Sequence, residues 1–228
     1  MILNNSRPIR SYIKRQGRLT NAQKNAIEFH GRNYLMDFQD KHISFDNLFV
    51  KNLPIVFEIG FGMGGATHQI TKDNPEKNYI VTDVHQPGIG NLIKLCTLDS
   101  LENIKIIEYD GLEVLRTMFI NHCLLGINIF FPDPWHKKRH NKRRLINKDS
   151  LELFSKKIMF GGMLHIASDW EPYAMKIIDL IRQDSNYQII NNHFNERPKF
   201  RPETKYESRG IRLGHKVWDI LAMRRKPL

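Results

Sequence analysis

The sequence predicts an α/β protein with a mostly parallel sheet and helices on both of its faces. Strand-like and helix-like segments alternate regularly from residue 55 to residue 183, and a glycine-rich turn follows the first of these strands. The chain has 228 residues and is 41% hydrophobic, which is enough for one well-buried core. Such alternation is typical of strand–helix–strand units, whose helices cover the sheet.

Each expected strand is a short apolar run, and the glycines after the first alternating strand open the helix that follows it. A first helix, over 21–36, precedes the alternating part. Strands are expected over 55–60, 78–85, 104–109, 125–131, 163–168, 187–194 and 217–224, and further helices over 65–73, 91–98, 111–119, 148–160 and 170–183. In such sheets ligands bind at the carboxyl ends of strands, near the point where the strand order reverses.

The chain is strongly basic, with a net charge of +11 and a pI near 9.7. This excess raises the local concentration of polyanions, so nucleic acid is the first partner to consider and an anionic membrane surface the second. No apolar run approaches the ~20 residues of a membrane helix, and a secretion signal is missing. Cys96 and Cys123 lack metal-ligand spacing, which favours a reducing, cytoplasmic location and no metal site.

The first part of the chain has an unusual charge pattern. Residues 1–27 contain six lysines and arginines and no acid. Such a segment is typical of a mitochondrial transit peptide, or of an arm that folds over RNA. We therefore expect a basic N-terminal arm over 1–30 and a single domain over 31–228.

Glycines crowd the segment after the first alternating strand. Gly60, Gly62, Gly64 and Gly65 follow the acid Glu58. Glycine lets the backbone turn sharply and approach a ligand closely. Gly60, Gly62 and Gly65 match the dinucleotide pattern G-x-G-x-x-G, while an acid followed by alternating glycines is also the loop of S-adenosylmethionine enzymes. The loop by itself does not separate the two cofactors.

Two more acids follow the next two strands. Asp83 follows the second, where either cofactor offers ribose hydroxyls to a carboxylate. Asp110 ends the third, in a place suited to an adenine amino group. Each acid alone is typical of a solvated strand end, but with Glu58 they line three successive strand ends. No arginine stands beside Asp83, which argues against a 2′-phosphate on the ligand.

The fourth strand runs into "FFPDPWHKKRHNKRR", residues 130–144. Pro132 and Pro134 fix their own φ and restrain the residues before them, so Asp133 is expected in an extended, rigid loop. A hydride-transfer enzyme does not need an acid, a tryptophan and a dense basic run at this edge. A methyl-transfer enzyme must bind its acceptor there. The stretch therefore favours methyl transfer.

On these residues the chain resembles the bacterial tRNA (guanine-N7)-methyltransferases, of the TrmB type. The resemblance rests on "FEIGFGMGGAT", "FPDPWHKKRHNKRR", "SDWEPYA" and "TKYESRGIRLGHKVWD", and covers most of the chain from about Pro54 onward. It implies a Rossmann-like, S-adenosylmethionine-dependent methyltransferase fold and methylation of N7 of a guanine in the tRNA variable loop. tRNA is the implied partner, and both a monomer and a homodimer are compatible with the sequence.

The resemblance also implies the site residues, with Asp133 in the catalytic role. The implied cofactor-binding residues are Glu58, Gly60, Gly62, Gly64, Asp83, Asp110 and Asp133. The implied substrate-binding residues are Lys137, Asp169, Thr204, Lys205, Tyr206 and Glu207, and the implied RNA contacts are Arg139, His140, Asn141, Lys142, Arg143 and Arg144. One departure is visible, because Asp83 stands where the family pattern has Glu, one methylene longer.

Guanine N7 carries a free lone pair, so the methyl acceptor has no proton to lose, and methylation creates positive charge on the purine. Asp133 is the candidate to favour this charge or to orient the base. Because the donor edge of guanine lies opposite N7, we expect Asp169 or Glu207 to read that edge. Trp135 and His136 are candidates to stack on an extruded base, and the alternative for Trp135 is a core anchor under the loop.

Other classes of function stay open as alternatives. The nearest is an S-adenosylmethionine-dependent methyltransferase that acts on another RNA or another base position. An NAD-dependent oxidoreductase shares the glycine loop but does not account for the segment after the fourth strand. A non-enzymatic RNA-binding protein with a decayed cofactor pocket would not be expected to keep all four strand-end acids.

Overall fold

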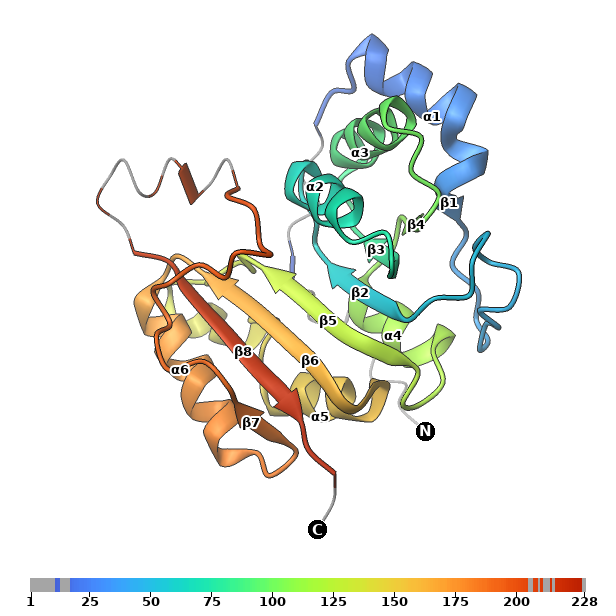
Figure 1. Ribbon diagram of the computed structural model, residues 1–228. Helices are drawn as coiled ribbons and strands as arrows, with labels where there is room; N and C mark the ends of the chain where they lie inside the picture. Colours follow the sequence, from blue (N-terminus) through green and yellow to red (C-terminus); the bar gives the residue numbers. More distant parts are fainter. Residues whose placement is uncertain are drawn as a thin grey trace, which may run out of the picture.

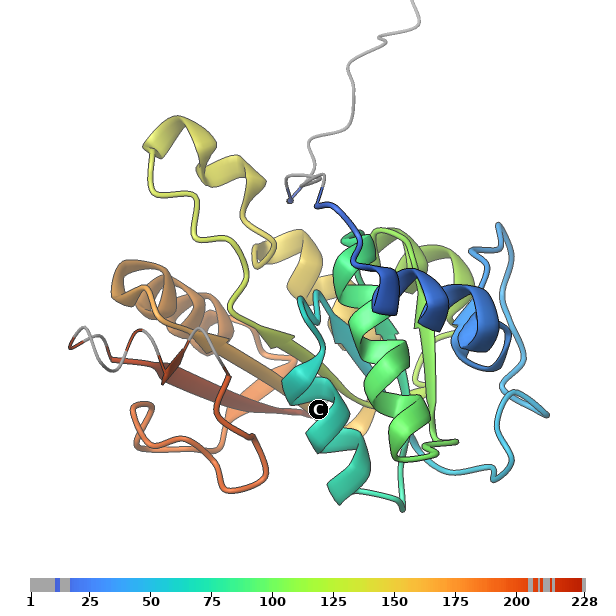
Figure 2. The same cartoon turned by 90° about the horizontal axis from the view of Figure 1, so that it is seen from above.

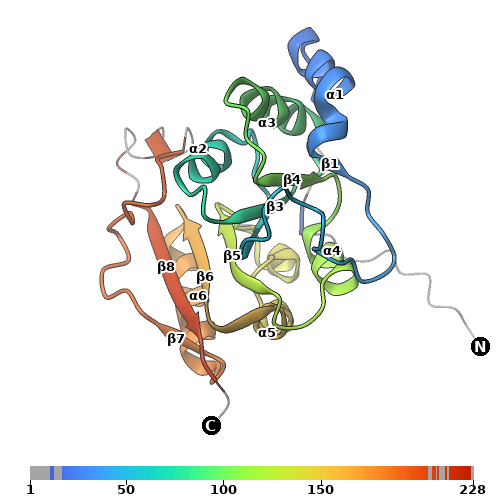
Figure 3. The same cartoon turned by 45° about the vertical axis from the view of Figure 1, so that its right-hand side comes forward.

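The computed structural model describes residues 11–12, 17–204, 207–208, 210, 214 and 216–226. In this part of the chain, eight strands form one sheet in the order β1-β4-β3-β2-β5-β6-β8-β7 (Figure 3). The strands are β1 (Leu35–Met36), β2 (Ile55–Ile59), β3 (Asn78–Thr82), β4 (Ile104–Ile107), β5 (Leu124–Phe130), β6 (Ile158–Ser168), β7 (Tyr187–Ile189) and β8 (Trp218–Arg224).

Helices connect most of these strands and cover both faces of the sheet. They are α1 (Asn21–Tyr34), α2 (Gly65–Asp73), α3 (Gln86–Leu98), α4 (Gly111–Met118), α5 (Lys148–Lys157) and α6 (Glu171–Gln183), with a 3₁₀ segment η1 (Lys138–Arg143). Figure 1 shows α2 and α3 on one side of the sheet and α5 and α6 on the other.

The two faces of the sheet bury two separate hydrophobic clusters. Phe57 of β2 packs in one cluster with residues of α4, α5 and α6, such as Phe154. Its neighbour Val56 packs in the other with residues of α1, α2 and α3, such as Leu92. Because successive strand residues point to opposite faces, a strand buried on both faces is mostly apolar, and β2 is buried along its whole length with Glu58 as its one polar residue. The expected α/β class is confirmed.

The strand order reverses next to β2. From β2 the chain adds β3 and β4 on one side, and β5 then returns to the other side, with β2 parallel to both β3 and β5. β6 is parallel to β5, whereas β8 is antiparallel to both β6 and β7. The carboxyl ends of β2 and β5 therefore meet at the switch point where ligands bind in open α/β sheets.

Several expected boundaries are wrong. The helix expected over 148–160 ends at Lys157, because the chain enters β6 at Ile158 and Leu124 of β5 pairs with that residue. The strand expected over 187–194 stops at Ile189. α3 begins at Gln86, ahead of the expected residue 91, with Pro87 in its first turn, a position that proline favours. β1 had no counterpart among the expected elements.

The domain boundary expected after residue 30 falls inside α1. This helix starts with a capping box, in which Thr20 and Gln23 exchange side-chain-to-backbone hydrogen bonds. α1 packs closely on α3: a Cβ at Gly90 would lie 2.8 Å from the Gln23 Cβ. Residues from Thr20 onward thus belong to the packed structure. Among the described residues, no helix is long and apolar enough to cross a membrane.

Candidate active site

The glycine loop forms an open cradle at the carboxyl end of β2. Gly60, Gly62 and Gly64 have φ values of +78°, +58° and +74°, in the left-handed region that only glycine adopts without strain. A Cβ on Gly64 would lie 2.7 Å from the Leu92 Cβ, so this glycine permits close packing of the loop on α3. Around the Cβ positions of Gly60 and Gly62, no described atom lies within 4 Å. The loop therefore presents bare backbone to open space.

Asp83 holds this loop in place. Its Oδ2 accepts a hydrogen bond of 2.7 Å from the Gly62 N–H, and its Oδ1 accepts from the Val84 and His85 N–H groups at 2.7 and 2.9 Å. Burial raises the pKa of Asp83, and the three backbone donors counteract part of that rise. Each carboxylate oxygen has two lone pairs, so Asp83 keeps acceptor capacity for ribose hydroxyls.

Glu58 lies buried in β2, just before the cradle. Its Oε1 accepts a hydrogen bond of 2.9 Å from the Thr67 hydroxyl, while Oε2 is buried without a hydrogen-bond partner among the described residues. Burial raises its pKa to about 7. A buried, half-satisfied carboxyl group is costly, so it marks a place where a ligand with hydrogen-bond donors fits.

Glu58→Gln should change how stability depends on pH in the ligand-free protein. Because the folded-state pKa lies above the ordinary value, the folded state binds this proton more tightly, and its contribution to stability is lost as pH rises through about 7. We expect the variant to be more stable than the wild type at pH 8, by on the order of 2 kcal/mol, and equally stable near pH 4, below the ordinary pKa of 4.5. Thermal unfolding at the two pH values measures this difference. The exposed Glu196→Gln is the matched control, and an E58Q difference that is the same at both values contradicts the expectation.

Asp110 lies beside the same cradle. Its carboxylate caps α4, accepting hydrogen bonds from the N–H groups of Leu112 at 2.9 Å and Glu113 at 3.4 Å. The next residue, Gly111, brings the start of α4 against β2 and β3, since a Cβ there would lie 2.7 Å from both Ile59 and Thr82 side chains. Glu58, Asp83 and Asp110 therefore lie at the carboxyl ends of the neighbouring strands β2, β3 and β4, where the sequence placed them, and Asp83 bonds to the glycine loop itself.

The segment after β5 projects from the end of the sheet, next to this cradle (Figure 2). Phe131 has φ +54° and Trp135 φ +44°, values that non-glycine residues adopt only when their surroundings hold them there. The Phe131 N–H donates to the Ala167 carbonyl of β6 at 2.8 Å. Asp133, between these two residues, is exposed.

Arg144 braces this segment from within. Its Nε donates to the Pro134 carbonyl at 2.8 Å, its guanidinium lies 4.7 Å from the centre of the Tyr173 ring, and the residue is buried. The Tyr173 hydroxyl in turn accepts from the Ile146 N–H at 3.0 Å. Burial raises the pKa of Tyr173 to about 12, and the Asp133 charge acts in the same direction. Arg144, expected as an RNA contact, is thus placed as a support for the Asp133 loop.

The other basic side chains after β5 differ in exposure. Lys137, Lys138, Arg139 and Lys142 are exposed, whereas His140, Asn141 and Arg143 are partly buried. The Arg143 guanidinium lies 4.1 Å from the centre of the Trp135 ring. Of the expected RNA contacts, Arg139 and Lys142 thus combine positive charge with free access from solvent, as do the neighbouring Lys137 and Lys138.

The Trp135 side chain is partly buried, and its ring nitrogen and ring both have partners within the protein. Its Nε1 donates to the Ser11 carbonyl at 3.0 Å, and Arg143 both lies on its ring and donates to the Tyr12 carbonyl at 3.4 Å. The sequence left Trp135 as either a stacking surface or an anchor. In this structure it anchors the N-terminal segment to the loop.

The expected substrate-binding residues fall into two environments. Asp169 is exposed at the carboxyl end of β6, and Lys137 is exposed after β5. Thr204 is partly buried, and its backbone N–H and side-chain oxygen both bond to Glu207. Glu207 itself is 3% exposed. Lys205 and Tyr206 lie outside the described residues.

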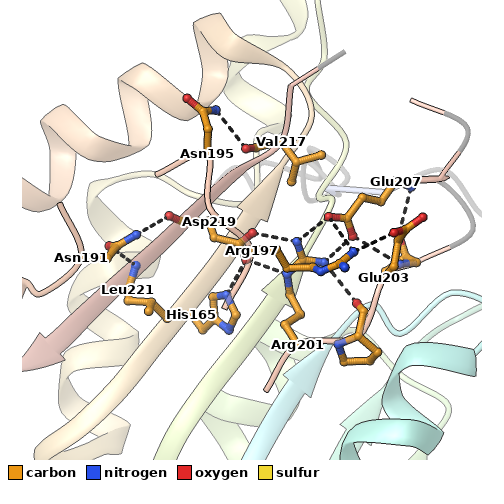
Figure 4. Close-up of polar contacts among 12 residues, drawn as sticks. His165, Asn191, Asn195, Arg197, Arg201, Glu203, Glu207, Val217, Asp219 and Leu221 are labelled. Atoms are coloured by element: carbon orange, nitrogen blue, oxygen red, sulfur yellow. Dashed lines mark hydrogen bonds and ion pairs between the residues drawn. The ribbon is translucent and has the colours of Figure 1, made fainter. Parts of the chain in front are cut away.

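Glu207 belongs to a buried ion-pair cluster with Arg201, Asp219 and His165 (Figure 4). Arg201 donates to both carboxylate oxygens of Glu207, at 2.7 and 2.9 Å, and to both of Asp219, at 2.6 and 2.7 Å. His165 of β6 bonds to Asp219 of β8 at 2.7 Å. Burial alone would raise the pKa of Asp219, but His165 and Arg201 outweigh it and the pKa lies below its usual value.

Arg201 links this cluster to the end of β5. Its guanidinium lies 5.8 Å from the Phe130 ring centre and 5.7 Å from that of Phe131, directly before the Asp133 loop. Sequence reasoning did not find Arg201 or Asp219. These two residues are 18 positions apart, and His165 and Asp219 are 54 apart, so no local spacing signals the cluster. No group of three or more metal-ligating side chains occurs among the described residues.

Solved structures with this fold include methyltransferases. A 16S rRNA methyltransferase, KamB, has a TM-score of 0.57 and 11% identity, over 80% of this chain and 93% of that one. An rRNA methylase from Streptococcus thermophilus has a TM-score of 0.52 and 11% identity, over 78% of this chain and 91% of that one. At such identities the likeness concerns the fold alone. The fold is the Rossmann-like fold that these methyltransferases share, and the glycine cradle lies at the sheet edge where ligands bind in such folds.

Comparison of sequences narrows this class. A family model described as "Putative methyltransferase" matches residues 52–220. Curated relatives named tRNA (guanine-N(7)-)-methyltransferase include those of Francisella philomiragia, 42% identical over 95% of both chains, and of Neisseria meningitidis serogroup C, 44% identical over 96% of this chain and 92% of the relative. The relative from Chromobacterium violaceum is 42% identical over 96% of this chain and 97% of its own. The chain belongs to the tRNA (guanine-N7)-methyltransferase family, and the resemblance is confirmed.

Proposed function

We propose that this protein transfers the methyl group of S-adenosylmethionine to N7 of a guanine in the variable loop of tRNA. The observation that carries the proposal is the adjacency of two features at one sheet edge. An open glycine cradle ringed by Glu58, Asp83 and Asp110 lies at the end of β2, and the braced Asp133 loop lies at the end of the neighbouring β5. Family membership supports the choice of substrate.

The cradle residues fit the cofactor. S-adenosylmethionine, when bound, supplies an electrophilic methyl group. Gly60 and Gly62 let the backbone come close to it, and the buried Glu58 Oε2 and the remaining lone pairs of Asp83 can accept hydrogen bonds from its donors. Asp110, at the start of α4, is placed to bound the adenine pocket.

Asp133 acts on the acceptor side in this proposal. Guanine N7 has a free lone pair, so the protein need only align it with the methyl group and stabilise the positive charge that forms on the purine. The Asp133 carboxylate is exposed on a loop held by Arg144 and by left-handed residues on either side. A group held in advance can orient the base or stabilise its charge without reorganising during the reaction.

Asp169 is the better candidate to read the donor edge of guanine. Both oxygens of Glu207 already accept hydrogen bonds from Arg201, and one also accepts from the Thr204 N–H. Asp169 is exposed, at the end of a strand adjacent to β5. D169N should therefore lose preference for guanine over inosine at the target position. If E207Q loses that preference and D169N keeps it, the assignment is reversed.

Incubation with an unmodified tRNA transcript and methyl-labelled S-adenosylmethionine tests the proposed function. Nuclease digestion and mass spectrometry then identify the labelled nucleoside and its position. We expect 7-methylguanosine in the variable loop. Label on another base or atom would support the alternative RNA methyltransferase, and tRNA binding without label transfer would support a non-enzymatic RNA-binding protein. Calorimetry with S-adenosylmethionine and NAD separates the two cofactors.

The exposed cations after β5 should govern the salt dependence of tRNA binding. Each phosphate contact releases condensed counterions, so replacing both Lys138 and Lys142 with Ala should lower the slope of log K against log salt by about 2 if each contacts one phosphate. Affinity titrations at several salt concentrations measure the slope. Lys51→Ala is the control, because Lys51 is exposed before the amino end of β2, away from the site. An unchanged slope in the double variant would place both lysines off the RNA.

A further inference from the structure

Two tryptophans lie near the Asp133 loop, and the structure gives them opposite environments. Trp135 is engaged by Ser11 and Arg143, as described above. Trp170 is 39% exposed. An exposed aromatic ring beside a proposed RNA site can contact a base, whereas the Trp135 ring is partly buried and already in contact with Arg143.

The backbone of Trp170 is held firmly even though its side chain is exposed. Trp170 is the N-cap residue of α6, and its carbonyl accepts hydrogen bonds of 3.0 Å from the N–H groups of Tyr173 and Ala174. Its own N–H donates to the Ser168 hydroxyl at 3.3 Å. Because this backbone is already ordered, only the side-chain torsions of Trp170 remain to be fixed on binding, which suits a stacking platform.

The two strands that lead to Asp133 and Trp170 end side by side. Phe130 of β5 pairs with Ala167 of β6, and the two parallel strands end side by side. Asp133 follows Phe130 by three residues, and Trp170 follows Ala167 by three residues. The proposed charge-stabilising group and the exposed ring therefore leave the sheet at one edge, from neighbouring strands.

His136 completes an aromatic pair across these two strand ends. Its ring lies edge-on to Trp170, with 4.3 Å between ring centroids and 79° between planes. His136 is exposed and is followed directly by the exposed Lys137 and Lys138. Aromatic rings beside cations are the arrangement by which proteins hold unstacked nucleic-acid bases and the adjoining phosphates.

We propose that Trp170, supported edge-on by His136, is the surface on which the target purine stacks once it leaves the RNA stack. The inference rests on the proposed function and assigns its base platform to a residue outside the expected site. The occupant is an extruded purine rather than an apolar protein segment, because exposed basic side chains follow His136 and complement the RNA backbone, and the exposed acids Asp133 and Asp169 precede His136 and Trp170 in the chain.

Trp170→Ala should weaken binding of unmodified tRNA by about 10-fold or more, the equivalent of 1–3 kcal/mol for one stacked base. Trp170→Phe keeps an aromatic face and should stay within about threefold of the wild type. Affinity for S-adenosylmethionine should not change in either variant. Phe29→Ala removes another exposed aromatic ring, on α1, and serves as the control.

A tRNA that carries an abasic nucleotide at the target position separates stacking from a structural effect. We expect the wild type and W170A to bind this tRNA equally, because no base is present to stack. If W170A weakens binding of both tRNAs by the same factor, Trp170 does not stack on the target and the inference is wrong. If W170F binds as poorly as W170A, an aromatic platform is also ruled out.

The failure of this inference can be told apart from the failure of the proposed function. The wild type alone tests the function, through label transfer to guanine. A wild type that methylates tRNA, together with a W170A variant of wild-type affinity and rate, overturns the stacking role and leaves the function intact. Quenching of tryptophan fluorescence by tRNA, present in the wild type and reduced in W170F, is an independent readout of stacking.

Discussion

Asp133→Asn is expected to lower kcat for tRNA methylation by about 10²- to 10³-fold, the usual loss when one preorganised electrostatic group is removed from a reaction centre. The change replaces a charged group by a neutral one of nearly the same shape. Because Asp133 is exposed, the melting temperature should stay close to that of the wild type. Single-turnover methyl transfer with saturating S-adenosylmethionine and tRNA measures the chemical step directly.

The matched control is Asp179→Asn, the same change at an exposed position on α6. It should leave the rate unaltered. Asp133→Glu keeps the charge but moves it by one methylene, so partial activity would indicate that charge matters more than placement. A D133N rate within threefold of the wild type would show that Asp133 neither stabilises nor orients the acceptor.

Arg201→Met should reduce the free energy of unfolding by about 3–5 kcal/mol, the typical result of removing one partner from a buried ion-pair cluster. Methionine fills much of the volume, but Asp219 and Glu207 lose four hydrogen bonds from the guanidinium and remain buried as carboxylates. In a domain of this size the loss corresponds to a fall in melting temperature of roughly 10 °C. Urea or thermal unfolding measures the change.

Arg197→Met is the control for that experiment. Arg197 lies in the same segment and pairs with Glu203 at 3.0 Å and at a longer 3.5 Å with Glu207, but its side chain is 36% exposed, unlike that of Arg201. Exposed pairs contribute at most about 1 kcal/mol, so the variant should unfold almost as the wild type does. If R201M and R197M are equally stable, the buried cluster does not anchor the 197–208 segment to β8.

Much of the fold followed from local patterns. The helix 65–73 was expected with the bounds that α2 has, and β2, β3, β4 and β5 were placed within three residues of their observed ends, whereas β1 was not expected. Alternating apolar runs and glycine turns carry this information, because neighbouring residues determine them. The boundary between α5 and β6 was missed, because Ile158 joins β6 through pairing with Leu124, which is 34 residues away.

For the candidate site, the sequence predicted which strand ends carry the acids but did not predict which basic side chains are exposed. Glu58, Asp83 and Asp110 lie at one edge of the sheet because parallel strands bring their carboxyl ends together whatever their separation in sequence. The sequence predicted that all of residues 139–144 contact RNA. The structure divides the basic run after β5, since Arg144 turns inward to Tyr173 and Pro134 while Lys138 and Lys142 remain exposed.

The sequence by itself determined the order of elements, the glycine cradle, the strand-end acids and the family. Each of these depends on residues close together in the chain, or on the general rule that parallel strands end together. Only the tertiary structure decided which side chains are free to act. Antiparallel β8 lies between β6 and β7 and brings Asp219 to His165 and Arg201, the cluster that holds Glu207. The return of the N-terminal segment to Trp135 leaves Trp170 as the open ring. Such contacts join residues from distant parts of the chain, and their strength depends on burial, which no local pattern records.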